Sequence, residues 1–296
     1  MLRIHFNAKL AVAALALAGA APVPADQSSQ PAVELVRQTA QKEIAAGDGG
    51  AGATFLDRKE TPHGSQTKLI VETRQGMAGM TIAFNDKPLT PEQRQAEQSR
   101  LSELASNPEA LKKKQKTEKE DSERITGIMK ALPDAFLYEP DGTVEGNQKV
   151  GKDGDLLVRL KFRPDPRYSP PSHVEQVLTG MQGYLLIDAN QHRIAKIDGT
   201  LSKGVGFGWG ILGHLDRGGH FLVEQAEVIK GNWEITHMSL AFTGKELLFK
   251  SITVKSEETF SNFRPAPSNL SFAQGVELLM KQEAEIADNR PTPPNR

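Results

Sequence analysis

The feature that most constrains the fold is a long stretch, residues 183 to 264, in which apolar and polar residues alternate over extended segments joined by short turns. Alternation with a period of two is typical of β-strands, because successive side chains point to opposite faces of the sheet. Short connections favour antiparallel neighbours. The stretch therefore predicts one large antiparallel sheet.

This main run of strands begins just before residue 183. The strands are expected at 181–188, 193–202, 210–215, 219–229, 233–242 and 246–257. The turns between them are expected at 189–191, 216–218, 230–232 and 243–245, where Gly, Asn, Asp and Lys gather.

Other strands and several helices are expected before and after this run. Helical spacing of apolar residues predicts a helix over 30–46, and three short strands follow at 54–60, 66–74 and 77–84. Thr90 and Gln93 form a capping-box pattern, which begins a helical segment that reaches about residue 132 and is interrupted near Asn107 and Pro108. Strands at 135–140 and 155–163, a short helix at 173–178 and a helix at 272–286 complete the pattern.

The first residues look like a secretory signal. Arg3 and Lys9 supply positive charge, an apolar segment follows at 10–21, and 23–25 fits a small-x-small cleavage site. We expect residues 1–25 to be a signal peptide cleaved after Ala25, because the apolar segment is short for a bilayer span. The chain has no cysteine, which excludes anchoring through an acylated cysteine, so a soluble mature protein in a bacterial periplasm is expected.

Charge and motifs exclude several classes of function. With 36 basic and 37 acidic residues, the net charge of −1 offers no footprint for nucleic acid. His214, Asp216 and His220 lie close in sequence, but their spacing matches no known zinc pattern, so no metal and no other cofactor is expected. No catalytic motif is present either, so the protein is not expected to be an enzyme.

A glycine-rich segment, 204–210, alternates glycine with Val205, Phe207 and Trp209. In an extended chain the glycines share one face, which would let a helix, a backbone or a lipid chain approach closely; a flexible turn is the alternative. Residues 208–213 also match GxGxxG, but no helix is expected to follow, so the match is interpreted as accidental.

Both faces of the predicted sheet are partly apolar. Phe221, Val223 and Ile229 share a strand face with Gln225 and Glu227. Such a sheet needs cover on both sides, and a curved sheet with one apolar side partly open would form a ligand groove. A closed core remains the other interpretation.

The order of elements resembles the periplasmic lipoprotein-carrier superfamily of LolA and LolB, with the related sensor domains of the MucB/RseB type. The resemblance rests on this architecture over residues 30–264 and on the segment 183–188, an apolar strand ending in Asp, followed by 193–197. It implies an α+β fold, mainly antiparallel β, in which a curved half-barrel sheet is covered by helices over a cavity for acyl chains. We expect that domain to span 26–270 with a helical insertion at about 90–132, followed by a C-terminal helix and a disordered tail at 271–296.

Two functions remain open. The first is a non-enzymatic periplasmic protein that binds a lipid, an acyl chain or a lipoprotein in an apolar groove. The residues expected to line that groove are Phe207, Trp209, Phe221, Leu240 and Phe249. The second is an envelope sensor that contacts a partner protein through the sheet edge or the charged segment 112–123, although mixed charges there also fit a solvated helix face.

Overall fold

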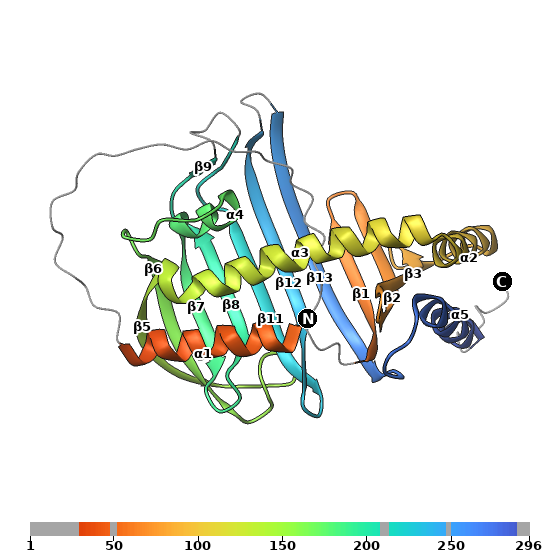
Figure 1. Ribbon diagram of the computed structural model, residues 1–296, viewed down its shortest axis with the longest axis horizontal. Helices are drawn as coiled ribbons and strands as arrows, with labels where there is room; N and C mark the ends of the chain where they lie inside the picture. Colours follow the sequence, from red (N-terminus) through yellow and green to blue (C-terminus); the bar gives the residue numbers. More distant parts are fainter. Residues whose placement is uncertain (1–29, 48–51, 208–212, 247–249, 289–296) are drawn as a thin grey trace, which may run out of the picture. The chain divides into compact units, whose positions relative to one another are not determined.

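The structure is a computed structural model that describes residues 30–47, 52–207, 213–246 and 250–288 (Figure 1). Its contacts divide the chain into two compact units. The first unit comprises Met1–Gly49 and Asp121–Glu257, and the second comprises Gly50–Glu120 and Glu258–Arg296. The expected signal peptide at 1–25 lies outside the described residues, as does the end of the tail. The domain boundaries expected from the sequence stay predictions, because compactness does not measure independent folding.

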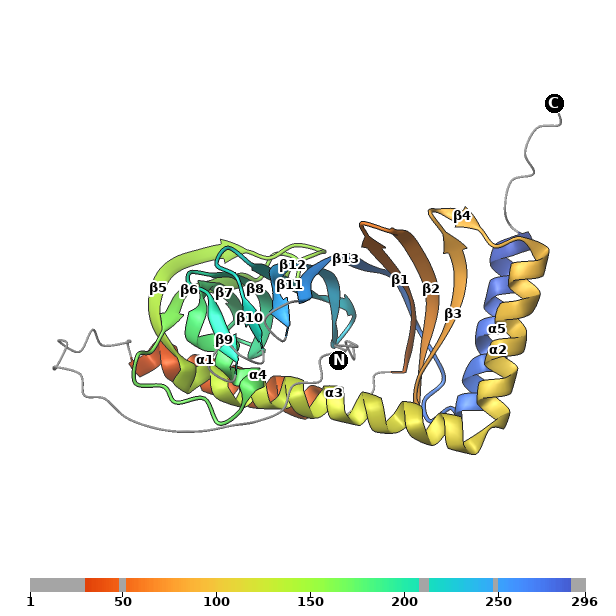
Figure 2. The same cartoon turned by 90° about the horizontal axis from the view of Figure 1, so that it is seen from above.

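The first unit is built on an antiparallel sheet with the strand order β13-β12-β11-β8-β7-β6-β5. Figure 2 shows strands β5 to β12 curving over helix α1. The strands of this unit are β5 (Phe136–Glu145), β6 (Leu156–Pro164), β7 (Met181–Asp188), β8 (Arg193–Leu201), β9 (Val205–Phe207), β10 (Gly213–Leu215), β11 (His220–Ile229), β12 (Asn232–Glu246) and β13 (Lys250–Pro265), of which the last continues into the second unit.

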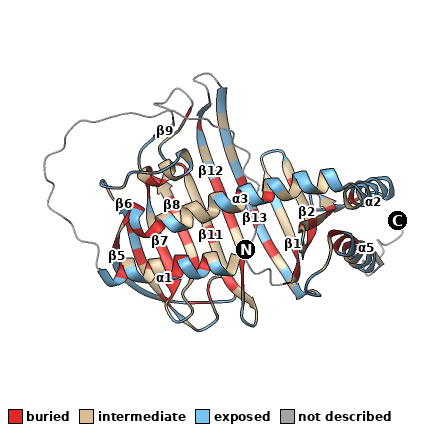
Figure 3. Ribbon diagram, in the orientation of Figure 1, coloured by how far each residue is buried: buried red, intermediate tan, exposed pale blue. Residues whose placement is uncertain are grey.

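Helices cover the inner face of this sheet. Helix α1 (Gln30–Gly47) turns Ala32 and Val36 toward the sheet, and Leu132 near the end of α3 (Pro108–Ala135) joins them. These side chains form one core with apolar residues of β5 to β8, and Leu178 of the short η1 (Val177–Gly180), which follows α4 (His173–Gln176), closes it on another side. Figure 3 shows the buried residues concentrated on strands beneath the helices.

The second unit has the strand order β4-β3-β2-β1-β13. Its strands are β1 (Ala53–Thr61), β2 (Gly64–Thr73), β3 (Gly76–Phe84) and β4 (Lys87–Pro88). Helices α2 (Pro91–Ser106) and α5 (Phe272–Asp288) pack on β3, and α5 also reaches β2. Leu101, Phe272 and Leu279, all almost completely buried, join Val71 and Met80 in a separate core.

The sequence expectations for these elements are largely confirmed. The α+β class with a mainly antiparallel, curved and helix-covered sheet is observed, and β7 occupies the expected residues. The Thr90–Gln93 capping box forms as expected, with both hydrogen bonds present. None of the described helices combines the length and the apolarity that crossing a membrane requires.

The expected turn at 243–245 is wrong. Strand β12 continues to Glu246, because the short strand β10 pairs with this end, Leu215 opposite Gly244. A Cβ at Gly244 would lie 2.1 Å from the carbonyl oxygen of His214, so the glycine permits a close approach of two backbones. Strand β13 likewise runs beyond the expected end at residue 257, to Pro265.

Candidate functional site

The candidate site begins with two of the predicted lining residues on the inner face of the first sheet. Phe221 of β11 and Leu240 of β12 lie directly opposite each other in the antiparallel register, so their side chains share a face. Leu240 is only 6% exposed, whereas Phe221 is half-buried and packs against the core under α1. The register therefore brings these two residues together.

The side chains of the other three predicted lining residues lie outside the described part of the structure. Trp209 and Phe249 lie outside the described residues, and only the backbone of Phe207 is described. That backbone ends β9 opposite Gly213, whose other partner is Glu246 at the end of β12. The three strand ends therefore meet at one end of the sheet.

Further apolar side chains lie at the margin of the same core. Leu215 of β10 and Phe242 of β12 are half-buried and pack against it, and Val205 of β9 is buried within it. Sequence analysis did not include these three among the lining residues. The period-two spacing of Leu240 and Phe242 was the available signal, since residues two apart on a strand share a face.

The inner face therefore changes in character across the sheet. Over β5 to β8 it is filled by helix side chains, and Leu160, Leu185 and Ile187 are at most 1% exposed. At the β10 to β12 side, three residues, Leu215, Phe221 and Phe242, are only partly covered in the described part of the chain, although Leu240 beside them is buried. Such a margin offers apolar contact area while the rest of the face acts as a closed core.

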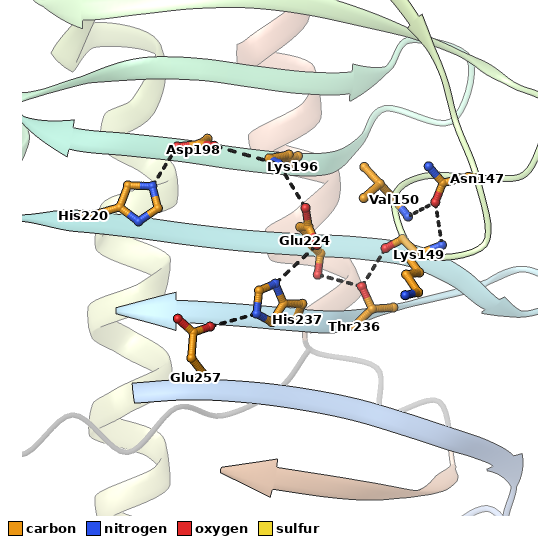
Figure 4. Close-up of polar contacts among 10 residues, drawn as sticks. All are labelled: Asn147, Lys149, Val150, Lys196, Asp198, His220, Glu224, Thr236, His237 and Glu257. Carbon is orange, nitrogen blue, oxygen red and sulfur yellow. Dashed lines mark hydrogen bonds and ion pairs between the residues drawn. The ribbon is translucent and has the colours of Figure 1, made fainter. Parts of the chain in front are cut away.

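The opposite face of strands β8, β11 and β12 carries a row of alternating charges (Figure 4). Lys196 donates to Glu224 at 3.0 Å and lies 3.9 Å from Asp198, while His220 Nε2 lies 2.9 Å from Asp198 Oδ1. Burial lowers the pKa of Lys196, but its contacts with Glu224 and Tyr184 outweigh this effect and raise the pKa above the ordinary value. Lys196 therefore stays charged within the row.

The row continues toward β13 through His237. Its Nδ1 lies 3.4 Å from Glu224, and its Nε2 lies 2.9 Å from Glu257 (Figure 4). At the β-bulge beside Glu224, Thr236 donates to the carbonyl of Lys149 at 2.6 Å, which ties the loop before β6 to the sheet. Along the row, carboxylates alternate with Lys196 and the two histidines, so each carboxylate has a hydrogen-bond or ion-pair partner on the face opposite the core.

The histidines whose sequence spacing raised the question of a metal site lie on different strands, His214 on β10 and His220 on β11, and each contacts its own carboxylate. His214 lies 3.1 Å from Asp216, whereas His220 contacts Asp198. Within the part of the chain that the structure describes, no cluster of three or more His, Cys, Asp or Glu side chains is arranged to hold a metal ion.

Comparisons with known proteins give one distant structural similarity. A crystal structure of a DUF1329 family protein from Desulfovibrio piger matches with 11% sequence identity and a TM-score of 0.28; the match covers 83% of this chain and 96% of that one. No family model matches the sequence, and no curated protein does. The resemblance to the LolA and LolB carriers therefore stays a prediction.

Proposed function

We propose that this chain is an exported, non-enzymatic periplasmic protein that binds the acyl chain of a lipid or lipoprotein at the inner face of its first sheet. The observation that carries the proposal is the partly covered apolar margin formed by Leu215, Phe221 and Phe242 beside a closed core. A curved sheet with helices on its inner face supports the same interpretation.

The margin suits an acyl chain in its chemistry. Burial of apolar surface contributes about 25 cal/mol per Å², so a contact of about 100 Å² contributes roughly 2.5 kcal/mol. Binding of this kind needs few polar partners. The charged row lies on the opposite face of the same strands, with Glu224 beside Val223 in sequence, so an apolar ligand would meet only the inner face.

Native mass spectrometry of protein purified from a periplasm, with extraction of any bound lipid, tests the proposal. The expected result is a chain that begins at Asp26 and carries a co-purified acyl lipid or lipopeptide. Absence of any bound lipid, also after incubation with phospholipid vesicles and lipopeptide, would contradict the binding function and favour the sensor alternative.

Variants locate the binding surface. Phe221→Ser and Trp209→Glu should each reduce lipid uptake at least tenfold while the circular dichroism spectrum stays unchanged. Leu156→Asp is the matched control, because Leu156 is an apolar residue of the same sheet that is 63% exposed and lies outside the core. Equal uptake by Phe221→Ser, Trp209→Glu and Leu156→Asp would place the ligand elsewhere.

A further inference from the structure

One end of the first sheet carries three basic side chains. Lys203 lies in the connection between β8 and β9, Arg217 in the turn between β10 and β11, and Lys245 in β12. We call these three residues the basic rim. All three are exposed, and no hydrogen bond or ion pair engages their side chains within the described part of the chain. Their charges therefore face solvent without a partner.

Backbone pairing brings the three positions of the basic rim together. The N–H of Gly218 donates to the carbonyl of Leu201 at 2.8 Å. The turn that holds Arg217 therefore lies beside the end of β8, from which the chain continues to Lys203. Strand β10, which leads into this turn, pairs with β9 on one side and on the other with the end of β12, which carries Lys245. The three residues thus lie at the same end of one sheet.

The positive charge is local to this end of the sheet. The two sequence segments that contain the rim, 202–218 and 243–250, have four lysine or arginine residues and two acidic ones, whereas the whole chain has a net charge of −1. The carboxylate of Asp216 is already engaged, since His214 lies 3.1 Å from it and the hydroxyl of Thr243 donates to it at 2.8 Å. An anionic partner would therefore be attracted to the basic rim rather than to the molecule as a whole.

The basic rim borders the apolar margin. Leu215 lies two residues before Arg217, and Phe242 lies three residues before Lys245. A Cβ at Gly219 would lie 2.4 Å from Cδ1 of Phe242, so the phenyl ring packs on the chain segment just after the Arg217 turn. Cations beside partly covered apolar side chains suit the surface of an anionic bilayer, because the cations attract the headgroup phosphates and the apolar side chains meet the acyl boundary.

We propose that the basic rim docks this protein onto the surface of a membrane that contains anionic phospholipids, with the apolar margin turned toward the lipids. The inference rests on the proposed function for its purpose, because docking at this end would let an acyl chain pass between the bilayer and the margin. The electrostatic contact itself needs no acyl ligand, so the two proposals can fail separately.

Vesicle flotation of the full mature chain tests the docking. One set of vesicles is pure phosphatidylcholine, and the other contains equal parts of phosphatidylcholine and phosphatidylglycerol. The protein should float with the anionic vesicles only, and raising the salt to about 1 M, where the Debye length is about 3 Å, should release it. Binding to both sets alike, or to neither, would overturn the inference. Binding to soluble polyglutamate as tight as that to the anionic vesicles would also contradict it, and would favour an acidic protein partner.

Charge variants locate the contact. The rim variant carries Lys203→Gln, Arg217→Gln and Lys245→Gln. The control variant carries Lys130→Gln, Lys149→Gln and Lys230→Gln, which remove the same charge at exposed positions elsewhere in the first unit. Each cation near an anionic surface strengthens binding about fivefold, so the rim variant should bind the anionic vesicles about a hundredfold more weakly, and the control variant less than about fivefold more weakly. An equal loss in the two variants would mean that the rim is not the contact.

A second measurement separates this inference from the proposed function. Uptake of monomeric lysophosphatidylcholine, which has no net charge, should depend on the apolar margin and not on the rim. The rim variant should keep this uptake, whereas Phe221→Ser should lose it and still float with the anionic vesicles. If Phe221→Ser loses vesicle binding as completely as the rim variant does, the cations do not carry the contact and the inference is wrong. Absence of uptake by the parent protein, with vesicle binding intact, would contradict the proposed function alone.

Discussion

Glu43 and Arg193 lie 150 positions apart in the sequence, yet Arg193 donates hydrogen bonds of 3.0 and 3.1 Å to the two carboxylate oxygens of Glu43. Both side chains are largely buried, at 3% and 11% exposure, so the pair lies in a medium that screens charge weakly. The contact attaches helix α1 to the first residues of β8.

The first prediction concerns this pair. Glu43→Ala leaves the guanidinium of Arg193 buried without its partner, and removing one member of a buried pair typically costs about 3–5 kcal/mol. Urea denaturation should show a loss of this size in the free energy of unfolding. Glu34→Ala on the exposed part of α1 should change it by less than about 0.5 kcal/mol. The double variant Glu43→Leu with Arg193→Met should be more stable than Glu43→Ala, and if it is not, the pairing does not explain the loss.

The second prediction follows from Asp57 on β1. Burial, reinforced by the nearby Glu258 and opposed by Lys68 and Lys59, raises the pKa of Asp57 from 3.8 to about 6. Since the pKa is higher in the folded state, the folded protein binds the proton more tightly. The resulting stabilisation is fully present below about pH 4 and is lost as the pH rises through about 6.

Asp57→Asn removes this dependence. At pH 7.5 it should stabilise the second unit by at most about 3 kcal/mol, whereas at pH 4 it should have little effect. Urea midpoints measured from pH 4 to 8 test this. Asp153→Asn, at an exposed loop position of the first unit, is the control. If the urea midpoint of Asp57→Asn falls with rising pH as steeply as that of the parent protein, Asp57 is not the group responsible for the pH dependence.

The third prediction concerns Gly76, the first residue of β3 after the turn from β2. Its φ is +109°, and a Cβ there would lie 2.1 Å from Oε2 of Glu118, whose side chain is buried. Gly76→Ala therefore combines backbone strain with a collision. Gly154 also has a positive φ, +80°, but no atom lies within 4 Å of its Cβ position, so Gly154→Ala measures the backbone strain alone.

Thermal unfolding should separate these two effects. Gly154→Ala should cost about 1 kcal/mol, and Gly76→Ala should cost at least twice as much. In a Glu118→Ser background, Gly76→Ala should lower the free energy of unfolding by less than it does in the parent protein. Equal costs for the two glycine variants would mean that Glu118 does not restrict this turn.

The fourth prediction concerns the start of α2. Thr90 Oγ1 accepts from the N–H of Gln93 at 3.2 Å, and Gln93 Oε1 accepts from the N–H of Thr90 at 2.9 Å. Thr90→Ala should reduce stability by about 1 kcal/mol, and Thr90→Ser should retain most of it. Ser102→Ala, within the same helix, should be neutral or slightly stabilising, because alanine favours the helix interior. A neutral Thr90→Ala would show that the cap does not contribute to stability.

Much of the secondary structure could be predicted from the sequence, because it depends on neighbours along the chain. The helix expected at 30–46 is observed as Gln30–Gly47, and the final helix expected at 272–286 is observed as Phe272–Asp288. The capping box of α2 could also be predicted, because its donors and acceptors lie three residues apart in the sequence.

The candidate site was predictable only in part. The period-two pattern placed Phe221 and Leu240 on strand faces, but their direct opposition depends on the register of β11 and β12. The apolar margin with Phe242 and Leu215 depends on which part of the sheet the helices cover. The cleft lined by Gln41, Asn190 and Trp233 had no sequence signal, because its residues come from α1 and from two turns that are distant in the sequence.

The element types, the α+β class and most strand boundaries follow from local periodicity and turn chemistry, so they could be predicted from the sequence alone. Three features came from the folded structure instead: β12 continues through Gly244 to pair with β10, Glu43 binds Arg193, and charges gather around Glu224 on one face of the sheet. The physical reason is that pairing and burial join residues far apart in the chain, and such contacts leave no periodic mark in the sequence.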